Sequence, residues 1–335
     1  MALQVATYNA GLAVGVLPLS TERLPLVIDA LGSLEVDLLF VQELWLDAHW
    51  ELLRAHVVAQ WPHAVRPEPT RRMDTGGCLA EDVAPLVACA NVHCAGFRDE
   101  ALAQCVVTHC VPVALGMPSR CLNCIASHPS GTLDEIVSRC LAHEDELTPD
   151  EDAPTGLVAY GGSFGTGLLS RYPLLDREVI AYRSTVNARG AVHARIEHDE
   201  IGDVHVFATH FSPGGAEQGP QVSRLVDWIA ERAGDAPAIV LGDLNMTAGS
   251  SLFHRIEAAG FRQPDELDRR GTYCGSGLGT GCIGSATWRI DHVLTRGLGR
   301  VRSERVLDEP VDVRVSGRRV TTTLSDHFGV LARIG

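Results

Sequence analysis

Short apolar segments that end in polar side chains recur along this chain. The clearest is residues 239–245, where three apolar residues and a glycine precede Asp243, Leu244 and Asn245. An apolar run bounded by glycine predicts a buried strand, and residues two apart on a strand point the same way. We therefore expect Asp243 and Asn245 to face one site, although both residue types are also common in turns.

The same alternation predicts strands and helices over most of the chain. Strands are expected at residues 3–9, 36–43, 164–170, 178–182, 191–196, 203–209, 287–294 and 328–334. Helices are expected at 21–34, with Ser20 as the N-cap, and at 47–58, 221–232 and 251–259. Strands that alternate with helices predict an α/β fold.

Polar residues lie at or beside many of these strands, and strand ends can converge on one edge where ligands bind. The set is Asn9, Glu43, His210, Asp243, Asn245, Asp291, Asp326 and His327. Taken singly, each is equally well explained as a turn or core residue. Together, carboxylates and amides suit Mg²⁺ or Mn²⁺ better than zinc, and histidines supply acid–base groups near neutral pH. Hydrolysis of a phosphodiester needs this combination.

Residues 70–154 depart from the strand–helix pattern and contain eight of the ten cysteines. The pattern Leu-x-x-Cys-x-x-x-His-Cys at 86–94 recurs at 102–110, and helices are expected at 84–94, 99–110 and 133–143. We interpret this segment as a small helical insertion within a single domain that spans residues 1–335.

The cysteines of the insertion allow three interpretations. Disulfides are favoured, and in a helical hairpin that turns near Gly96, Cys89 would lie opposite Cys105. A Cys/His site for zinc or copper is the alternative, although the spacing matches no specific zinc pattern. Buried free thiols, which pack as small apolar groups, are the third.

Composition and charge restrict the classes of function. The chain is 45% hydrophobic and 21% charged, which is typical of a globular protein with a substantial core. Its net charge of −14 argues against a broad nucleic-acid surface. We find no apolar run of the ~18–20 residues that a membrane span requires, and no secretory signal at the N-terminus. A missing signal favours the cytoplasm whereas ten cysteines suit an exported protein, so the localisation stays open.

Four motifs resemble those of the endonuclease/exonuclease/phosphatase superfamily and follow that family's order. They are Thr7-Tyr8-Asn9, Gln42-Glu43, Gly242-Asp243-Leu244-Asn245 and Ser325-Asp326-His327. The match covers residues 1–66 and 155–335. The resemblance implies a four-layer α/β/β/α sandwich of two mixed sheets, to which the insertion is added. It also implies a divalent cation, Mg²⁺ or Mn²⁺, held by Glu43 and Asn9 with help from Asp326.

The resemblance also implies the catalytic roles. His327 would be the general base, oriented by Asp291. His210 and Asn245 would stabilise the phosphorane, and Asp243 would position the nucleophile or the leaving group.

Within the family, several stretches resemble neutral sphingomyelinases. Examples are Val-Gln-Glu-Leu-Trp at 41–45, Gly-Thr-Gly-Leu-Leu-Ser at 165–170 and Arg-Ile-Asp-His at 289–292. Related nucleases often carry an acidic residue near the position of Gly167 that orients the first histidine, and this chain has none there. Arg189 is interpreted either as a phosphate contact or as a surface arginine.

We therefore expect a Mg²⁺-dependent phosphodiesterase that acts on a phospholipid headgroup, with a lipid favoured over nucleic acid. The apolar, helical insertion would provide a peripheral membrane contact. One alternative is a DNase-type endonuclease or exonuclease. The other is an insertion that acts as a binding or metal-holding module, with zinc as its less favoured metal, on a phosphatase-like domain.

Overall fold

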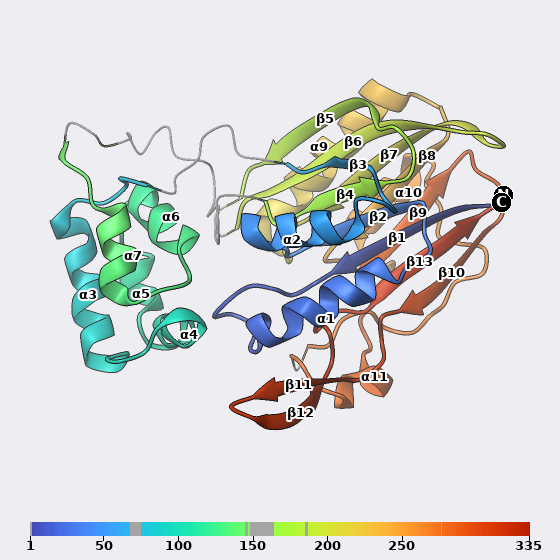
Figure 1. The fold of residues 1–335 in the computed structure, drawn as a ribbon. Helices are drawn as coiled ribbons and strands as arrows, with labels where there is room; N and C mark the ends of the chain where they lie inside the picture. Colours follow the sequence, from blue (N-terminus) through green and yellow to red (C-terminus); the bar gives the residue numbers. More distant parts are fainter. Residues whose placement is uncertain (1, 68–74, 145–146, 148–163, 185–186, 276) are drawn as a thin grey trace.

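The computed structural model describes residues 2–67, 75–144, 147, 164–184, 187–275 and 277–335, and two β-sheets form the centre of this part (Figure 1). The first sheet contains β1 (Leu3–Asn9), β2 (Leu38–Gln42), β3 (His63–Val65), β4 (Gly167–Ser170), β10 (Val301–Val306) and β13 (Gly329–Ile334). The second contains β5 (Leu175–Tyr182), β6 (Arg189–His198), β7 (Gly202–His210), β8 (Ala238–Asp243) and β9 (Asp291–Arg296). A separate hairpin is formed by β11 (Val311–Val315) and β12 (Arg318–Thr322).

Both sheets mix parallel and antiparallel pairs. Their orders are β10-β13-β1-β2-β4-β3 and β5-β6-β7-β8-β9. The parallel pairs are β1 with β2 and β7 with β8, while the other neighbours run antiparallel. The parallel pairs bring the carboxyl ends of β1 and β2, and of β7 and β8, to common edges.

Alternating side chains on the strands contribute to three cores, one between the sheets and one beneath the helices on each outer face. Leu3 and Val5 of β1 pack between the sheets, whereas Ala6 and Tyr8 of the same strand face the helices. Helices α1 (Ser20–Gly32) and α2 (Asp47–Val57) cover the first sheet, and α9 (Gly215–Ala233) and α10 (Ser251–Ala258) cover the second. This arrangement confirms the predicted α/β/β/α sandwich.

The predicted strand at residues 287–294 begins later than expected. β9 starts at Asp291, so the polar pair Asp291-His292 opens the strand instead of lying in its middle. Trp288 lies before the strand, where its side chain is exposed and its backbone forms a bridge with Tyr273.

The N-cap expected at Ser20 is wrong, because α1 begins at Ser20 itself and the Ser20 hydroxyl donates to the Leu17 carbonyl. The first amides of α1 donate instead to the Glu100 carboxylate: Ser20 N lies 3.0 Å from Oε1 and Thr21 N lies 3.1 Å from Oε2. A carboxylate at a helix N-terminus satisfies free amides and interacts favourably with the helix dipole. The cap thus comes from the cysteine-rich part of the chain.

Residues 75–144 form a helical body that we call the cysteine-rich lobe, and it lies beside α1 in Figure 1. Its helices are α3 (Ala80–His93), α4 (Asp99–His109), α5 (Val111–Ala114), α6 (Ser119–Ser127) and α7 (Leu133–Cys140). The lobe lies between β3 and β4 in the chain. Residues 70–74 and most of 145–154, which the predicted insertion includes, lie outside the described residues.

All ten cysteines lie in the described ranges, and they form five disulfides. Those of the lobe are Cys78–Cys121, Cys89–Cys110, Cys94–Cys105 and Cys124–Cys140, and Cys274–Cys282 joins residues near α11 (Gly281–Ser285). The disulfide interpretation is therefore correct, and no thiolate remains for a zinc site. The predicted Cys89–Cys105 pair is wrong. Both disulfides of the α3–α4 hairpin are centred on residues 99–100, not on Gly96. Cys89 therefore pairs with Cys110, which lies later in the chain than the predicted partner, Cys105.

Within the described ranges, none of the helices combines the length and hydropathy that are needed to cross a bilayer.

Two of the buried histidines in the second sheet, His193 and His292, have strongly lowered pKa values. His193 on β6 packs against Phe207 and Trp228, at centroid distances of 4.7 and 5.7 Å. Its pKa falls to about 4 because burial and the neighbouring His205 disfavour the charged ring. Burial and Arg289 likewise lower the pKa of His292 to about 4. Both rings are therefore neutral in the folded protein near neutral pH.

These histidines predict an acid-sensitive fold. In the unfolded chain they titrate near pH 6.5, so between about pH 6.5 and 4 the unfolded state binds more protons and the free energy of unfolding falls as the pH falls. Urea unfolding at a series of pH values measures this slope. His193→Phe should flatten the slope, whereas the same substitution at the exposed His254 should not. Equal slopes in the His193→Phe variant and the wild type would contradict the assignment.

The disulfide pattern predicts defined cross-linked peptides. Digestion without reductant, followed by mass spectrometry, should release peptides that join Cys89 to Cys110 and Cys94 to Cys105. After reduction these species should separate. A peptide that joins Cys89 to Cys105 would refute the pairing seen here.

Candidate active site

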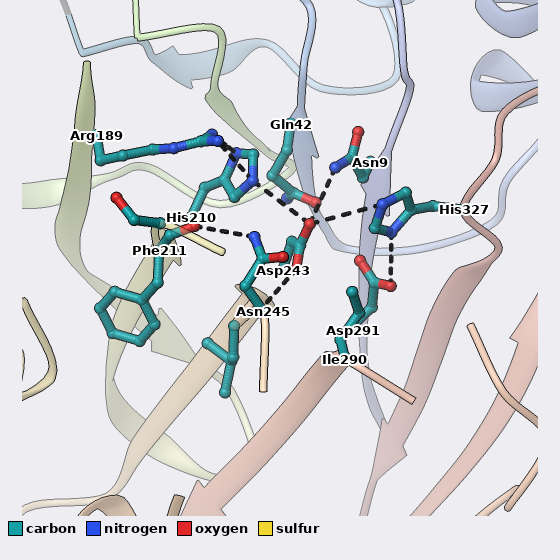
Figure 2. Close-up of polar contacts among 12 residues, drawn as sticks. Asn9, Gln42, Arg189, His210, Phe211, Asp243, Asn245, Ile290, Asp291 and His327 are labelled. Carbon is teal, nitrogen blue, oxygen red and sulfur yellow. Dashed lines mark hydrogen bonds and ion pairs between the residues drawn. The ribbon is translucent and has the colours of Figure 1, made fainter. Parts of the chain in front are cut away.

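Five of the predicted site residues meet where the ends of the two sheets face each other (Figure 2). Asn9 ends β1, His210 ends β7 and Asp243 ends β8. Because β9 runs antiparallel to β8, its first residue, Asp291, pairs with Asp243. His327 lies two residues before β13, which runs antiparallel to β1. The directions of these strands therefore place all five side chains at the same edge of the two sheets.

Asp243 is the centre of the group. Its Oδ2 accepts a hydrogen bond from Asn9 Nδ2 at 3.0 Å, and it lies 3.4 Å from His210 Nε2 and 3.8 Å from His327 Nε2. Burial alone would raise the pKa of this carboxyl group, but His327, His210 and Asn9 outweigh burial and hold the pKa well below its usual range. Asp243 is therefore a buried carboxylate that stays ionised.

The glycine before Asp243 is required by the backbone. Gly242 has a φ of 143°, and a Cβ atom there would lie 1.8 Å from the Thr209 carbonyl oxygen. The close approach of β8 to the end of β7 brings Asp243 to His210, so the Gly-Asp sequence has a geometric reason.

His327 and Asp291 form a buried pair. Nδ1 of His327 lies 2.9 Å from Oδ2 of Asp291, and the Thr272 hydroxyl accepts from the Asp291 amide. Burial would lower the pKa of His327, but the carboxylates of Asp291, Asp243 and Asp326 outweigh it and raise the pKa to about 10. The ring therefore carries a proton in this charge environment, and Asp291 fixes which nitrogen faces Asp243.

His210 has a different neighbour. Nη1 of Arg189, at the start of β6, lies 2.7 Å from Nδ1 and 3.0 Å from Nε2 of His210. Burial and this guanidinium lower the pKa of His210, so the ring is neutral. Arg189 is itself buried, which excludes the surface-arginine interpretation.

At position 167, a Cβ atom would lie 2.2 Å from the Trp50 ring, so an acidic side chain has no room there.

Asn245 reaches the site differently from the expected strand geometry. β8 ends at Asp243, and Asn245 has a φ of 49° in the following turn. Its amide N–H donates to Asp243 Oδ1 at 2.9 Å, and its Nδ2 donates to the Phe211 carbonyl. The shared strand face predicted for Asp243 and Asn245 is therefore wrong, although the turn keeps the two residues together.

Glu43 and Asp326 lie at the border of the group. Burial raises the pKa of the Asp326 carboxyl group, His327 opposes this, and the Glu43 carboxylate raises it further. Glu43 also favours the charged forms of Arg189 and His210. The charge of Glu43 therefore affects the ionisation of Asp326 as well as that of Arg189 and His210. Glu43 has a φ of 55° at the turn after β2, a backbone conformation that is uncommon for a non-glycine residue.

The donor set fits a hard divalent cation. One atom each of Asp243, Asp291 and His327 lies within 4.8 Å of the others. Oδ1 of Asp291 is buried without a hydrogen-bond partner. The Glu43 carboxylate also disfavours the charged form of the Asp326 carboxylate. Buried unpaired oxygens and like charges are costly unless a cation compensates them. Asn9 is already engaged: its Oδ1 accepts from the Gly11 amide at 3.0 Å and its Nδ2 donates to Asp243.

Two further residues hold the site, and the sequence pattern did not identify them. The buried Arg23 of α1 donates to the carbonyls of Gly11 and Leu324, both at 2.6 Å, so it ties the loop after β1 to the loop that carries Asp326. Tyr273 packs on His327 with a centroid distance of 4.7 Å. Neither residue lies at a predicted strand end, and nothing in the local sequence distinguishes Arg23 from an exposed helical arginine.

Solved structures with the same fold include proteins of several activities. Sphingomyelinase C from Streptomyces griseocarneus aligns over 100% of both chains with a TM-score of 0.58 and 17% identity. Beta toxin from Staphylococcus aureus, with bound magnesium ions, aligns over 99% of both chains with a TM-score of 0.59 and 14% identity. Mannosyl-6-phosphatase from Bacteroides thetaiotaomicron aligns over 99% of both chains with a TM-score of 0.58 and 14% identity.

Sequence comparison points to one family. No curated protein matches the sequence. The model of the Endonuclease/Exonuclease/phosphatase family, however, matches residues 6–327. This range includes every residue of the site described above. The chain belongs to the endonuclease/exonuclease/phosphatase family.

Proposed function

We propose that this protein is a divalent-metal-dependent phosphodiesterase that cleaves the headgroup ester of a phospholipid. The observation that carries the hydrolase part is the buried group of Asp243, Asp291 and His327 at the junction of the two sheets. It combines buried carboxylates with a positioned imidazole, and phosphodiester hydrolysis requires groups of these types.

The proposed metal ligands are Glu43, Asn9 and Asp326, and Asn9 also orients Asp243 through its hydrogen bond. Mg²⁺ is the preferred ion because the ligands are oxygens, and Mn²⁺ is an acceptable substitute. When bound, the cation would neutralise the non-bridging phosphate oxygens and lower the pKa of His327 towards neutrality.

His327 is proposed as the general base. Its Nδ1 is held by Asp291, so Nε2 is the nitrogen that takes the proton from the attacking water. A base fixed within hydrogen-bond reach of its water typically contributes 10²–10⁴-fold to the rate. Asp243, between the two histidines, would position the nucleophile or the leaving oxygen.

His210, Arg189 and Asn245 are proposed to stabilise the phosphorane. Nδ1 of the neutral His210 accepts from Arg189, so its Nε2–H would be the donor, and the guanidinium supplies a fixed positive charge. Preorganised donors of this kind stabilise charge that develops in the transition state.

Three observations favour a lipid over nucleic acid. The net charge of −14 opposes a long polyanion. Arg189, rather than an acid, accompanies His210, unlike the arrangement implied by the nuclease resemblance. A sphingomyelinase C shares the fold over its full length.

The proposal also covers the domain organisation of the chain and the compartment in which the protein works. The cysteine-rich lobe is an insertion within a single domain, and it faces the lipid substrate. Five disulfides form and persist in oxidising compartments, so the protein would work outside the reducing cytoplasm.

A substrate comparison tests the proposal. Sphingomyelin and phosphatidylcholine, plasmid DNA and a sugar monophosphate should be assayed with Mg²⁺ and again with excess chelator. We expect release of phosphocholine that stops with chelator and returns with added Mg²⁺, and slow or undetectable cleavage of DNA. Faster cleavage of DNA than of lipid would replace the lipid proposal with the nuclease alternative. Hydrolysis that survives chelator would exclude the metal mechanism.

Replacement of His327 tests the assignment of the base. His327→Ala should lower kcat by roughly 10²–10⁴-fold while the circular dichroism spectrum stays unchanged. His254→Ala, at an exposed histidine of α10, is the matched control and should retain full activity. A loss of less than about tenfold in His327→Ala would remove the proposed role, because a general base contributes more than that.

A further inference from the structure

A cavity of about 440 Å³ lies between the cysteine-rich lobe and the catalytic edge of the sandwich. Its walls on the lobe side are apolar residues of α4 and α6, among them Leu102, Val106, Leu122 and Ile125. On the other side it reaches Trp45 and Glu43, the proposed metal ligand. Its size is typical of ligand sites, which occupy roughly 300–1,000 Å³.

The walls of this cavity are fixed in place. The Glu100 carboxylate receives the first two amides of α1, and the Thr21 hydroxyl also donates to it at 2.9 Å. A Cβ atom on Gly15 would lie 2.7 Å from Cβ of Ala103, so the loop before α1 is in direct contact with α4. The Cys89–Cys110 and Cys94–Cys105 bridges join α3 to α4 and its C-terminal end. The lobe is therefore docked, and the cavity is preformed.

The lining suits a hydrocarbon rather than a polar ligand. Glu43, His128 and Asn187 are the residues with polar side chains among those that the structure describes around the cavity, and most others are aliphatic. A peptide or a sugar would leave buried polar groups without partners, which is unfavourable. An alkyl chain has no such groups, and each buried methylene contributes favourably.

The outer rim of the cavity continues as an exposed apolar surface. Val16 is 55% exposed, Val107 39%, Val111 36% and Leu115 63%, and all four line the cavity. Exposed apolar groups that cluster in this way typically mark contacts with a membrane or a ligand. An alkyl chain could thus pass from a bilayer to the cavity over apolar surface.

We infer that this cavity binds one alkyl chain of the lipid substrate while the phosphodiester lies at Glu43. The inference rests on the proposed phosphodiesterase activity and adds the substrate class to it: a phospholipid with at least one long chain, selected by the cysteine-rich lobe. We take the occupant to be a single chain, with the headgroup at Glu43, the carboxylate that the cavity shares with the candidate site.

A binding experiment tests the cavity independently of catalysis. Dodecylphosphocholine, kept below its micellar concentration, should bind the wild-type protein in isothermal titration calorimetry. Ala126→Trp, which places an indole in the cavity, should weaken binding at least tenfold. Ala101→Trp, at an exposed position of the same lobe outside the cavity lining, is the matched control and should bind as the wild type does. Ala114→Phe provides a second blocking variant if Ala126→Trp does not fold.

A kinetic experiment connects the cavity to the reaction. Monomeric lysophosphatidylcholines of increasing chain length should show a kcat/KM that rises about threefold to fourfold per methylene, until the cavity is filled. p-Nitrophenylphosphorylcholine, which lacks the chain, should be cleaved equally by the wild type and by Ala126→Trp. The variant should lose the dependence on chain length.

The outcomes separate the two proposals. Binding of dodecylphosphocholine that Ala126→Trp leaves intact, or a kcat/KM that is independent of chain length, overturns the cavity inference even if hydrolysis occurs. Binding that Ala126→Trp abolishes, without hydrolysis of any phosphodiester, supports the alkyl-chain site and refutes the phosphodiesterase.

Discussion

A buried hydrogen bond between the two sheets determines the geometry of this site. Asn9 of β1 donates to Asp243 of β8 at 3.0 Å, with both side chains excluded from solvent. A carboxylate in that position is tolerated only with partners that compensate its charge or hydrogen-bond to it. The protonated His327 provides the opposite charge, and the neutral His210 lies close enough for a hydrogen bond. The polar residues that end β1 and β7 and begin β9 therefore surround Asp243 with hydrogen-bonding and charged groups.

Much of this arrangement follows from the sequence, because strand periodicity and strand direction are local properties. The alternation in β1 and β7 places Asn9 and His210 at strand ends, and the antiparallel start of β9 explains Asp291. Backbone turns and long-range contacts are not local, which is why the geometry of Asn245 was predicted incorrectly and Arg23 was missed. The disulfide error has a similar origin: a shift of a few residues in the turn between α3 and α4 changes every partner across a helical hairpin.

Helix α1 connects the cysteine-rich lobe to the loops of the candidate site. Its N-terminus is capped by Glu100 of the lobe, and one turn further along Arg23 holds the carbonyls of Gly11 and Leu324. The lobe and these loops therefore contact the same helix, and hydrogen bonds from the side chains of Glu100 and Arg23 to backbone groups fix the position of the cavity relative to the site.

The connectivity of the lobe's disulfides has a consequence for how the protein matures. Cys94–Cys105 lies inside the loop closed by Cys89–Cys110, which lies inside that of Cys78–Cys121, and Cys124–Cys140 follows separately. Because no bridge crosses another along the chain, oxidation can proceed outwards from the shortest loop, and no segment has to thread through a closed ring. Among these four bridges the loop of Cys94–Cys105 is the shortest, so it carries the smallest entropic penalty for closure.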